Sequence, residues 1–149
     1  MPVYPLEWQA PIKTGRYPHM AKHDARLWEL FLEQFGGNFL AISYDVALGG
    51  LISDEPGLDE GERLGWQYST AFKIDAVAAR EEEVWIIEVK PNASASALGQ
   101  ALCYTVLAED DDLSPLPLIP TVVTDRASAD IKRCAEALGV QLITLPEAP

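Results

Sequence analysis

Asp75, Glu88 and Lys90 are charged residues inside the two most apolar segments of the chain. Asp75 lies in AFKIDAVA, and Glu88 and Lys90 lie in VWIIEVK. Because side chains alternate across a strand, Glu88 and Lys90 point to the same face, and a hairpin between the two segments can bring Asp75 beside them. Burying such charges costs several kcal/mol each, as a rough estimate, unless they are paired or bind a metal. The arrangement therefore requires an explanation.

Two carboxylates and a lysine on one sheet face are the parts of a hydrolytic metal site. Carboxylates that converge from adjacent strands suit a hard divalent cation such as Mg²⁺ or Mn²⁺, which keeps several of its waters. The cation can polarise a phosphate and lower the pKa of a water. The lysine can position or deprotonate that water, or offset charge on the phosphate. This chemistry is metal-assisted phosphodiester hydrolysis.

A plainer interpretation of the same residues stays open at this point. Lys90 can form an ion pair with Glu88 or with Asp75 at the rim of an ordinary sheet. The chain would then be a plain α/β protein with an incidental Glu-x-Lys pair. A structure with Asp75 and Glu88 on opposite faces of the sheet would establish this interpretation.

Hydrophobic periodicity predicts the elements that position these three residues. Residues 1–22 hold four of the 11 prolines and show no sustained period, which predicts an irregular arm before a single domain over residues 23–149. Apolar residues at three- and four-residue spacing predict a helix over residues 23–35, which Gly36-Gly37 ends. The stretch 49–66 is rich in Gly, Asp and Glu and is predicted to be a long loop.

Apolar runs in the rest of the chain predict five strands and two further helices. Strands are expected at residues 39–48, 69–79, 84–90, 119–124 and 141–145. Helices are expected from Ser94 or Ser96 to about Glu109, and from Asp125 or Ser128 through Leu138. The second and third strands should form an antiparallel hairpin, with the third near the centre of the sheet. The predicted fold class is α/β (α+β), a mixed β-sheet flanked by helices in the order αβββαβαβ.

The spacing of the charged residues resembles a known family motif. Asp75, twelve intervening residues and then Glu88-Val89-Lys90 look like the motif of the PD-(D/E)XK nuclease superfamily, with Ile74 in place of the proline that names it. The resemblance implies a restriction-endonuclease-like fold. It also implies that Asp75 and Glu88 bind Mg²⁺ or Mn²⁺, that the Val89 backbone carbonyl completes the protein ligands, and that Lys90 assists the attacking water.

The helix after the third strand adds a second point of resemblance. GQALCY places Gln100 four residues before Tyr104, on one helical face. This is similar to the Gln-x-x-x-Tyr motif of the RecB-like exonuclease branch, which implies that the two residues help to position the substrate or the active-site groups. The first helix of such folds often lends a further acid to the site. Asp24 could do so here, or it could simply be a first-turn acid favourable to the helix dipole.

The charge balance limits how such a protein could bind nucleic acid. The formal net charge is −12, from 23 acidic and 11 basic residues. This argues against nonspecific, high-affinity DNA binding, because phosphate neutralisation supplies most of that affinity. One short stretch could still form a local basic patch, or could be a solvated arm, and it holds Lys13, Arg16, His19, Lys22, His23 and Arg26.

The leading hypothesis is a metal-dependent nuclease that acts on DNA. The alternative is a catalytically silent module with a nuclease fold that serves a phage or mobile-element assembly. The net charge favours the alternative, whereas the intact Asp–Glu–Lys set disfavours it. A homodimer is an expectation from the resemblance, since resolvase- and restriction-type members are commonly dimers.

Two further features concern the compartment. No run approaches the roughly 18 apolar residues of a membrane span, and the N-terminal MPVYPLEWQAP lacks the basic start and apolar run of a signal peptide. A cytoplasmic protein without a membrane partner is therefore expected. Cys103 and Cys134 belong to no Cys-x-x-Cys pair, and we expect both to be buried as small apolar residues.

Overall fold

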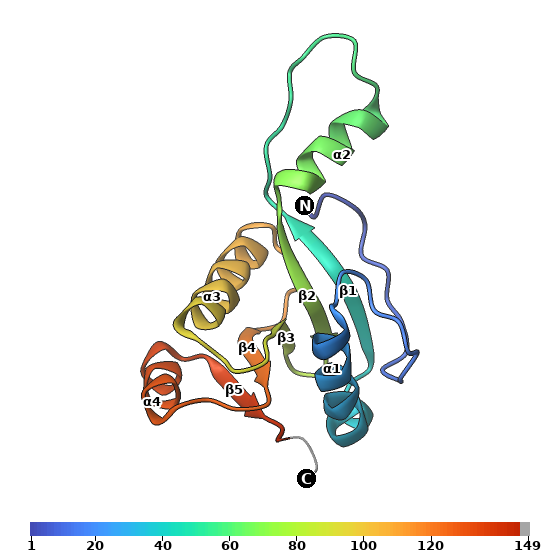
Figure 1. Ribbon diagram of the computed structural model, residues 1–149. Helices are drawn as coiled ribbons and strands as arrows, with labels where there is room; N and C mark the ends of the chain where they lie inside the picture. The colour runs from blue at the N-terminus through green and yellow to red at the C-terminus, as the bar shows by residue number, and fades with distance from the viewer. Residues whose placement is uncertain (147–149) are drawn as a thin grey trace.

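The computed structural model describes residues 1–146, which form a mixed five-stranded sheet with helices on both faces (Figure 1). This confirms the predicted mixed α/β architecture. The end of the predicted domain, residues 147–149, lies outside the described residues. In chain order the elements are α1 (Lys22–Phe35), the short 3-10 helix η1 (Gly36–Asn38), β1 (Ala41–Leu48), α2 (Glu60–Thr70), β2 (Phe72–Ala79), β3 (Val84–Val89), α3 (Ala95–Asp110), β4 (Leu118–Thr124), α4 (Ala129–Leu138) and β5 (Gln141–Thr144).

The sheet follows the chain order, β1-β2-β3-β4-β5. β1, β2 and β3 pair antiparallel, whereas β3, β4 and β5 pair parallel. The predicted β2–β3 hairpin is confirmed, and β3 is the middle strand, with all six residues buried. A strand buried on both faces needs apolar side chains throughout, which is why β3 reads as a continuous apolar run.

The two faces of the sheet are covered by different helices (Figure 1). α1 packs on one face, where Trp28 and Phe31 of the helix join Trp85 and Ile87 of β3. α3 packs on the other face, where Tyr104 and other residues of the helix meet side chains of β1, β2 and β3. α4 lies beside α3 and shares a small cluster with it under β4. The chain therefore has a core on each side of β3.

The segment between β1 and β2 differs from the prediction. Only residues 49–59 form a loop, α2 follows it, and β2 begins at Phe72 rather than Ser69. A capping box starts α2, because the Asp59 side chain accepts from the backbone N–H of Glu62 while the Glu62 carboxylate accepts from that of Asp59. No residue of α2 is fully buried, so the helix lacks the apolar stripe that reveals a packed helix in a sequence. The observed order is therefore αβαββαβαβ.

The N-terminal arm lies along the free edge of β1. The Val3 N–H donates to the Ala47 carbonyl at 2.9 Å. Further along, Gln9 and Ile42 exchange backbone hydrogen bonds of 2.8 and 2.9 Å. The arm is irregular, but these two contact points fix its course beside the strand.

Two sequence expectations concern single features of this fold. Within residues 1–146, no helix is both long and apolar enough to cross a membrane. The predicted burial of the cysteines is wrong, because Cys103 and Cys134 are free thiols on the exposed sides of α3 and α4. Neighbouring helix positions such as Ala101, Tyr104 and Ala135 fill the buried sides instead.

Candidate active site

Asp75 and Glu88 lie beside each other on the β2–β3 hairpin. The β2–β3 ladder ends with the pair of Ala76 and Ile87, and Asp75 and Glu88 are the residues that flank this pair on β2 and β3. An Asp75 carboxylate oxygen accepts a hydrogen bond of 2.8 Å from the backbone N–H of Val89. The two carboxylates are close enough that Asp75 raises the pKa of Glu88. The structure therefore brings the two carboxylates together on the hairpin.

The alternation of side chains along β2 is interrupted at Asp75. Ala76 and Ala78 pack toward α1, whereas Ile74 packs in the cluster on the α3 face, although strict alternation would place all three on one face. Asp45, across from Asp75 in the β1–β2 register, adopts the left-handed backbone region at φ 50°. Such a conformation is uncommon for a residue with a side chain. The sheet is thus locally irregular where the acids gather.

Burial dominates the electrostatics of the two acids. Glu88 is only 8% exposed, and its Oε2 atom has no hydrogen-bond partner. Burial is the main cause that raises the pKa of Glu88, and the adjacent Asp75 raises it further. Burial also raises the pKa of Asp75, opposed by the Val89 N–H and assisted by Asp24 and Asp45. Without a cation, the site holds more negative charge than its surroundings stabilise.

The two residues of the helix motif have different positions. Tyr104 is buried on α3 facing the sheet, and its hydrogen bond to Glu88 lowers the pKa of that carboxyl. Burial and the nearby acids raise the pKa of Tyr104, so its hydroxyl stays protonated and acts as the donor. Gln100 lies one turn earlier on α3 and is exposed. The structure therefore brings Tyr104 into the cluster and leaves Gln100 facing solvent.

Lys90 and Asp24 complete the charged surroundings. Lys90 follows the last residue of β3, is exposed, and lowers the pKa of both Asp75 and Glu88. Asp24 stands in the first turn of α1, as predicted, and is also near enough to raise the pKa of both acids. Burial raises the pKa of Asp24 itself, while Lys90 lowers it. Asp24 is thus a first-turn acid that also borders the cluster.

The donor set fits a cation that brings its own water. Within residues 1–146, no three His, Cys, Asp or Glu side chains converge as a complete metal-binding group. Mg²⁺ does not need one, because it commonly binds proteins through one or two carboxylates and keeps several waters. Asp75, Glu88 and the backbone carbonyl of Val89 could supply such a partial set. The unpartnered Oε2 of Glu88 supports the fit, since a buried anionic oxygen without a partner is unfavourable.

A second polar cluster joins three segments at Asp45, and sequence analysis missed it. The Tyr68 hydroxyl of α2 donates to Asp45 Oδ2. His19 Nε2, from the N-terminal arm, lies 2.8 Å from that hydroxyl oxygen and 3.3 Å from Asp45 Oδ2. No spacing in the sequence could reveal the cluster, because its members lie far apart along the chain. The one local signal was an aspartate inside the apolar strand β1.

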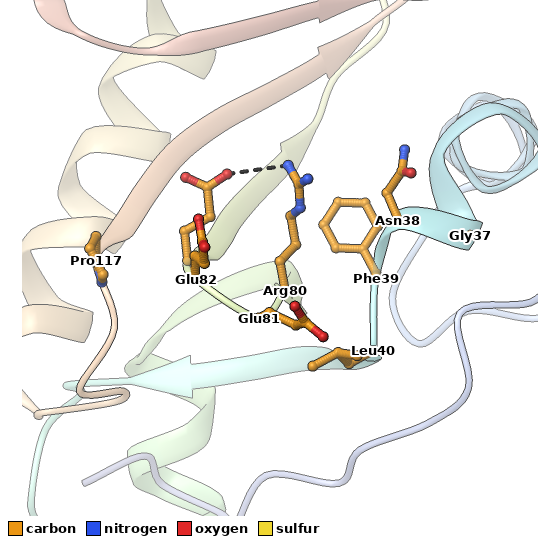
Figure 2. A pocket seen from close by; sticks show the side chains of 9 residues that line it. Gly37, Asn38, Phe39, Leu40, Arg80, Glu81, Glu82 and Pro117 are labelled. Carbon is orange, nitrogen blue, oxygen red and sulfur yellow. Dashed lines mark hydrogen bonds and ion pairs between the residues drawn. The ribbon is translucent and has the colours of Figure 1, made fainter.

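A cavity of about 470 Å³ lies away from these acids, at the turn end of the β2–β3 hairpin. Figure 2 shows Arg80 beside Phe39 there, with Glu81 and Glu82 nearby. Arg80 forms an ion pair of 3.3 Å with Glu83, so the only cation among the lining residues is already paired. This acidic cavity does not suit a phosphate, and the Asp75–Glu88 cluster remains the candidate site.

Removing the charge of Glu88 should stabilise the metal-free protein. Because the folded-state pKa of Glu88 is raised above its ordinary value of 4.5, the folded protein holds this proton more tightly than the unfolded chain does. The resulting stability is present below the ordinary pKa and is lost as pH rises toward the raised one. Glu88→Gln should therefore gain about 1 kcal/mol at mildly alkaline pH, or about 2–4 °C in melting temperature.

Thermal unfolding in chelator, at mildly acidic and mildly alkaline pH, measures this effect. The gain should shrink at acidic pH, where Glu88 of the wild type is protonated. Glu82→Gln is a matched control, because Glu82 is exposed at the hairpin turn. A Glu88→Gln protein that is less stable than wild type at alkaline pH would contradict the expectation.

Comparison with known proteins gives no family assignment. No protein-family model and no curated protein matches the chain. Among solved structures, the chain is similar to the protein of unknown function AF1548, with 22% identity over 79% of this chain and 52% of that chain and a TM-score of 0.44. It is also similar to protein VC1899 from Vibrio cholerae, with 17% identity over 87% of this chain and 35% of that chain and a TM-score of 0.47. The chain spans about half the length of the first and about a third of the second.

Proposed function

We propose that this protein is a metal-dependent nuclease of the PD-(D/E)XK type that hydrolyses phosphodiester bonds in DNA. The observation that carries the proposal is the adjacent pair of largely buried carboxylates, Asp75 and Glu88, with a Glu88 oxygen that no hydrogen bond satisfies. Keeping two such acids together is unfavourable unless something positive binds between them. Lys90 follows them on the same hairpin, which gives the acid–acid–lysine combination that this chemistry requires.

Each residue of the cluster has a distinct role in this proposal. Asp75 and Glu88 would hold Mg²⁺ or Mn²⁺, with the Val89 backbone carbonyl as a further ligand. When bound, the cation would polarise the phosphate and lower the pKa of the attacking water. Lys90 would position that water and offset negative charge on the phosphate. Tyr104 would hold the Glu88 carboxylate in place through its hydrogen bond.

The overall charge of −12 restricts how DNA could reach this site. A strand must approach where positive charge is concentrated. One depression near the start of α1 is lined by Arg16, Lys22 and Arg26 of the basic stretch. The first turn of the same helix carries Asp24. Lys90, directly after β3, and Gln100, one turn before Tyr104 on α3, are exposed and could contact the phosphate backbone. The proposal therefore favours local, salt-sensitive binding over tight nonspecific binding.

Tyr104→Phe should move metal binding and cleavage to higher pH. The Tyr104 hydrogen bond lowers the pKa of Glu88, so its loss raises that pKa, and the carboxylate form that binds metal then requires a higher pH. At neutral pH, cleavage should fall by about tenfold, the scale of a hydrogen bond to a charged group. Cleavage rates across a pH series measure the shift. Val106→Ala, at an exposed position of α3, should leave the profile unchanged, and an unshifted Tyr104→Phe profile would contradict this role.

A substrate panel tests the proposed function itself. End-labelled single-stranded and double-stranded DNA would be incubated with the protein in Mg²⁺, in Mn²⁺ and in chelator. We expect cleavage of at least one DNA form in either metal and none in chelator. If no DNA is cut and calorimetry detects no metal binding, the nuclease proposal is wrong, and the alternative of a silent interaction module with a nuclease fold takes its place.

A further inference from the structure

The cluster around Asp45 combines aromatic rings with the ammonium group of Lys73. The Tyr68 ring lies 5.8 Å from the Tyr4 ring and 6.0 Å from the His19 ring, measured between centroids. Lys73 Nζ lies 4.7 Å from the centroid of the same Tyr68 ring. Aromatic faces beside cations are the combination that proteins use to bind single-stranded nucleic acid, with bases on the rings and phosphates on the cations.

A cavity lies directly beside this cluster. The N-terminal arm contacts β1 at Val3 and again at Gln9, and between these points a cavity of about 240 Å³ separates the two segments. Tyr4, Pro18 and Asp45 are among its lining residues. Small-molecule sites usually enclose at least ~300 Å³. The cavity is therefore suited to one planar group rather than to a whole cofactor.

The hydrogen-bond pattern leaves one ring nitrogen of His19 available. The Tyr68 hydroxyl has a single hydrogen, and it donates this hydrogen to Asp45. Its oxygen therefore accepts from Nε2–H of His19, which lies 2.8 Å away. This contact and the nearby Asp45 carboxylate fix the ring through Nε2, while the His19 side chain stays 63% exposed. Nδ1 can then meet an incoming phosphate oxygen, and it donates to that oxygen when the ring is protonated.

The cluster is adjacent to the proposed catalytic acids. In the β1–β2 register, Tyr44 pairs with Ala76 and Val46 pairs with Ile74. Asp45 and Asp75 therefore lie across from each other between these two pairs. Neighbouring strands lie about 5 Å apart, whereas consecutive phosphates of a nucleic-acid strand are farther apart than that. One nucleotide step is therefore long enough to span the distance from β2 to β1. When a DNA strand is cleaved at Asp75, the neighbouring nucleotide would lie over the Asp45 cluster.

We propose that Tyr4, His19, Tyr68 and Lys73, gathered around Asp45 beside the cavity, bind the nucleotide next to the cleaved phosphodiester of a single-stranded DNA substrate. The base packs against the Tyr4 and Tyr68 rings at the mouth of the cavity. The phosphate contacts His19 Nδ1 and the Lys73 ammonium. The inference rests on the proposed nuclease only in placing the cleaved bond at Asp75 and Glu88.

Binding of a fluorescein-labelled single-stranded DNA oligonucleotide tests this site. Fluorescence anisotropy would be recorded with Ca²⁺ in place of Mg²⁺, after checking that the oligonucleotide stays intact. Tyr4→Ala should weaken binding by about tenfold, the scale of one lost base-stacking contact. His19→Ala should weaken it by about tenfold as well, the scale of one lost hydrogen bond to a charged group. Trp8→Ala is the matched control, because Trp8 is an exposed aromatic residue of the same arm outside the cluster. It should bind like the wild type.

A second variant separates positioning from contact. Tyr68→Phe keeps the ring but removes the hydroxyl that joins His19 to Asp45. In Mg²⁺ it should raise KM for the oligonucleotide severalfold while leaving kcat within about twofold, because it disturbs substrate placement and not the catalytic acids. Melting temperatures of Tyr4→Ala and His19→Ala should stay close to wild type, since both side chains are exposed.

The outcomes distinguish this site from the nuclease proposal. If the wild type binds and cuts DNA but Tyr4→Ala and His19→Ala bind as tightly as wild type, the nucleotide site is wrong and the nuclease stands. If the wild type binds the oligonucleotide but cuts neither single-stranded nor double-stranded DNA, and both variants lose binding, the nucleotide site stands and the nuclease is wrong. If the wild type neither binds nor cuts the single-stranded oligonucleotide, the nucleotide site is wrong, and cleavage of double-stranded DNA in the substrate panel decides the nuclease proposal separately.

Discussion

Replacing Lys90 with Ala should reduce the rate of metal-dependent DNA cleavage by about 10²–10⁴-fold, the range for a group that positions a nucleophile or stabilises developing charge. Lys90 is exposed at the end of β3, so its loss leaves no cavity in the core. Its ammonium lowers the pKa of both Asp75 and Glu88 but is not a metal ligand. Single-turnover cleavage at saturating Mn²⁺ should therefore fall, while calorimetric Mn²⁺ affinity at mildly alkaline pH, where the raised pKa of the two acids matters less, stays within a few-fold of wild type.

Two comparisons make the Lys90 result specific. Lys132→Ala removes an exposed lysine from α4 and should leave cleavage unchanged. Lys90→Arg keeps the charge with a different shape and donor geometry, so it should restore only part of the activity. A Lys90→Ala protein that cuts DNA within a few-fold of the wild-type rate would remove Lys90 from the mechanism.

Asp75→Asn should abolish both metal binding and cleavage. The amide keeps an oxygen that can accept the 2.8 Å hydrogen bond from Val89 N–H, so the local backbone has no reason to rearrange. It removes the negative charge that a divalent cation requires. Because even indirect disturbance of a metal site costs about 10–100-fold in affinity, loss of a direct carboxylate ligand should cost at least that much. Cleavage should fall by about 10³-fold or more.

Calorimetry with Mn²⁺ and single-turnover cleavage measure the two effects of Asp75→Asn together. Asp130→Asn is the matched control, since Asp130 is an exposed acid in the first turn of α4. The role of Asp75 as a ligand is excluded if Asp75→Asn binds Mn²⁺ as the wild type does.

The β2–β3 hairpin was predictable because two independent signals agree there. The apolar run of β3 reflects burial on both faces, and the short polar link at Arg80–Glu83 leaves room only for a tight antiparallel turn. Given that hairpin, Asp75 and Glu88 had to lie near each other. Tyr104 was singled out through its motif, and in the structure its hydroxyl lies beside Glu88.

Features that depend on contacts between distant segments could not be predicted from the sequence. α2 has no fully buried residue, so its helical character comes from the local Asp59–Glu62 capping box and not from an apolar stripe. The change of face at Asp75 and the left-handed backbone at Asp45 break the strict alternation on which strand reasoning relies. The contact of Asp45 with Tyr68 and His19 follows from the missed helix and from the path of the arm, which only the fold defines.

The role of the Asp75–Glu88 pair as the catalytic centre is tested most directly by comparing DNA cleavage by wild type and Glu88→Gln, because this substitution is expected to make the metal-free protein more stable. Unfolding then cannot explain a loss of function. We expect a Glu88→Gln protein that melts higher than wild type in chelator at mildly alkaline pH yet cuts no DNA in Mg²⁺ or Mn²⁺. A Glu88→Gln protein that cuts DNA at the wild-type rate would contradict the claim that the buried acid pair is the catalytic centre.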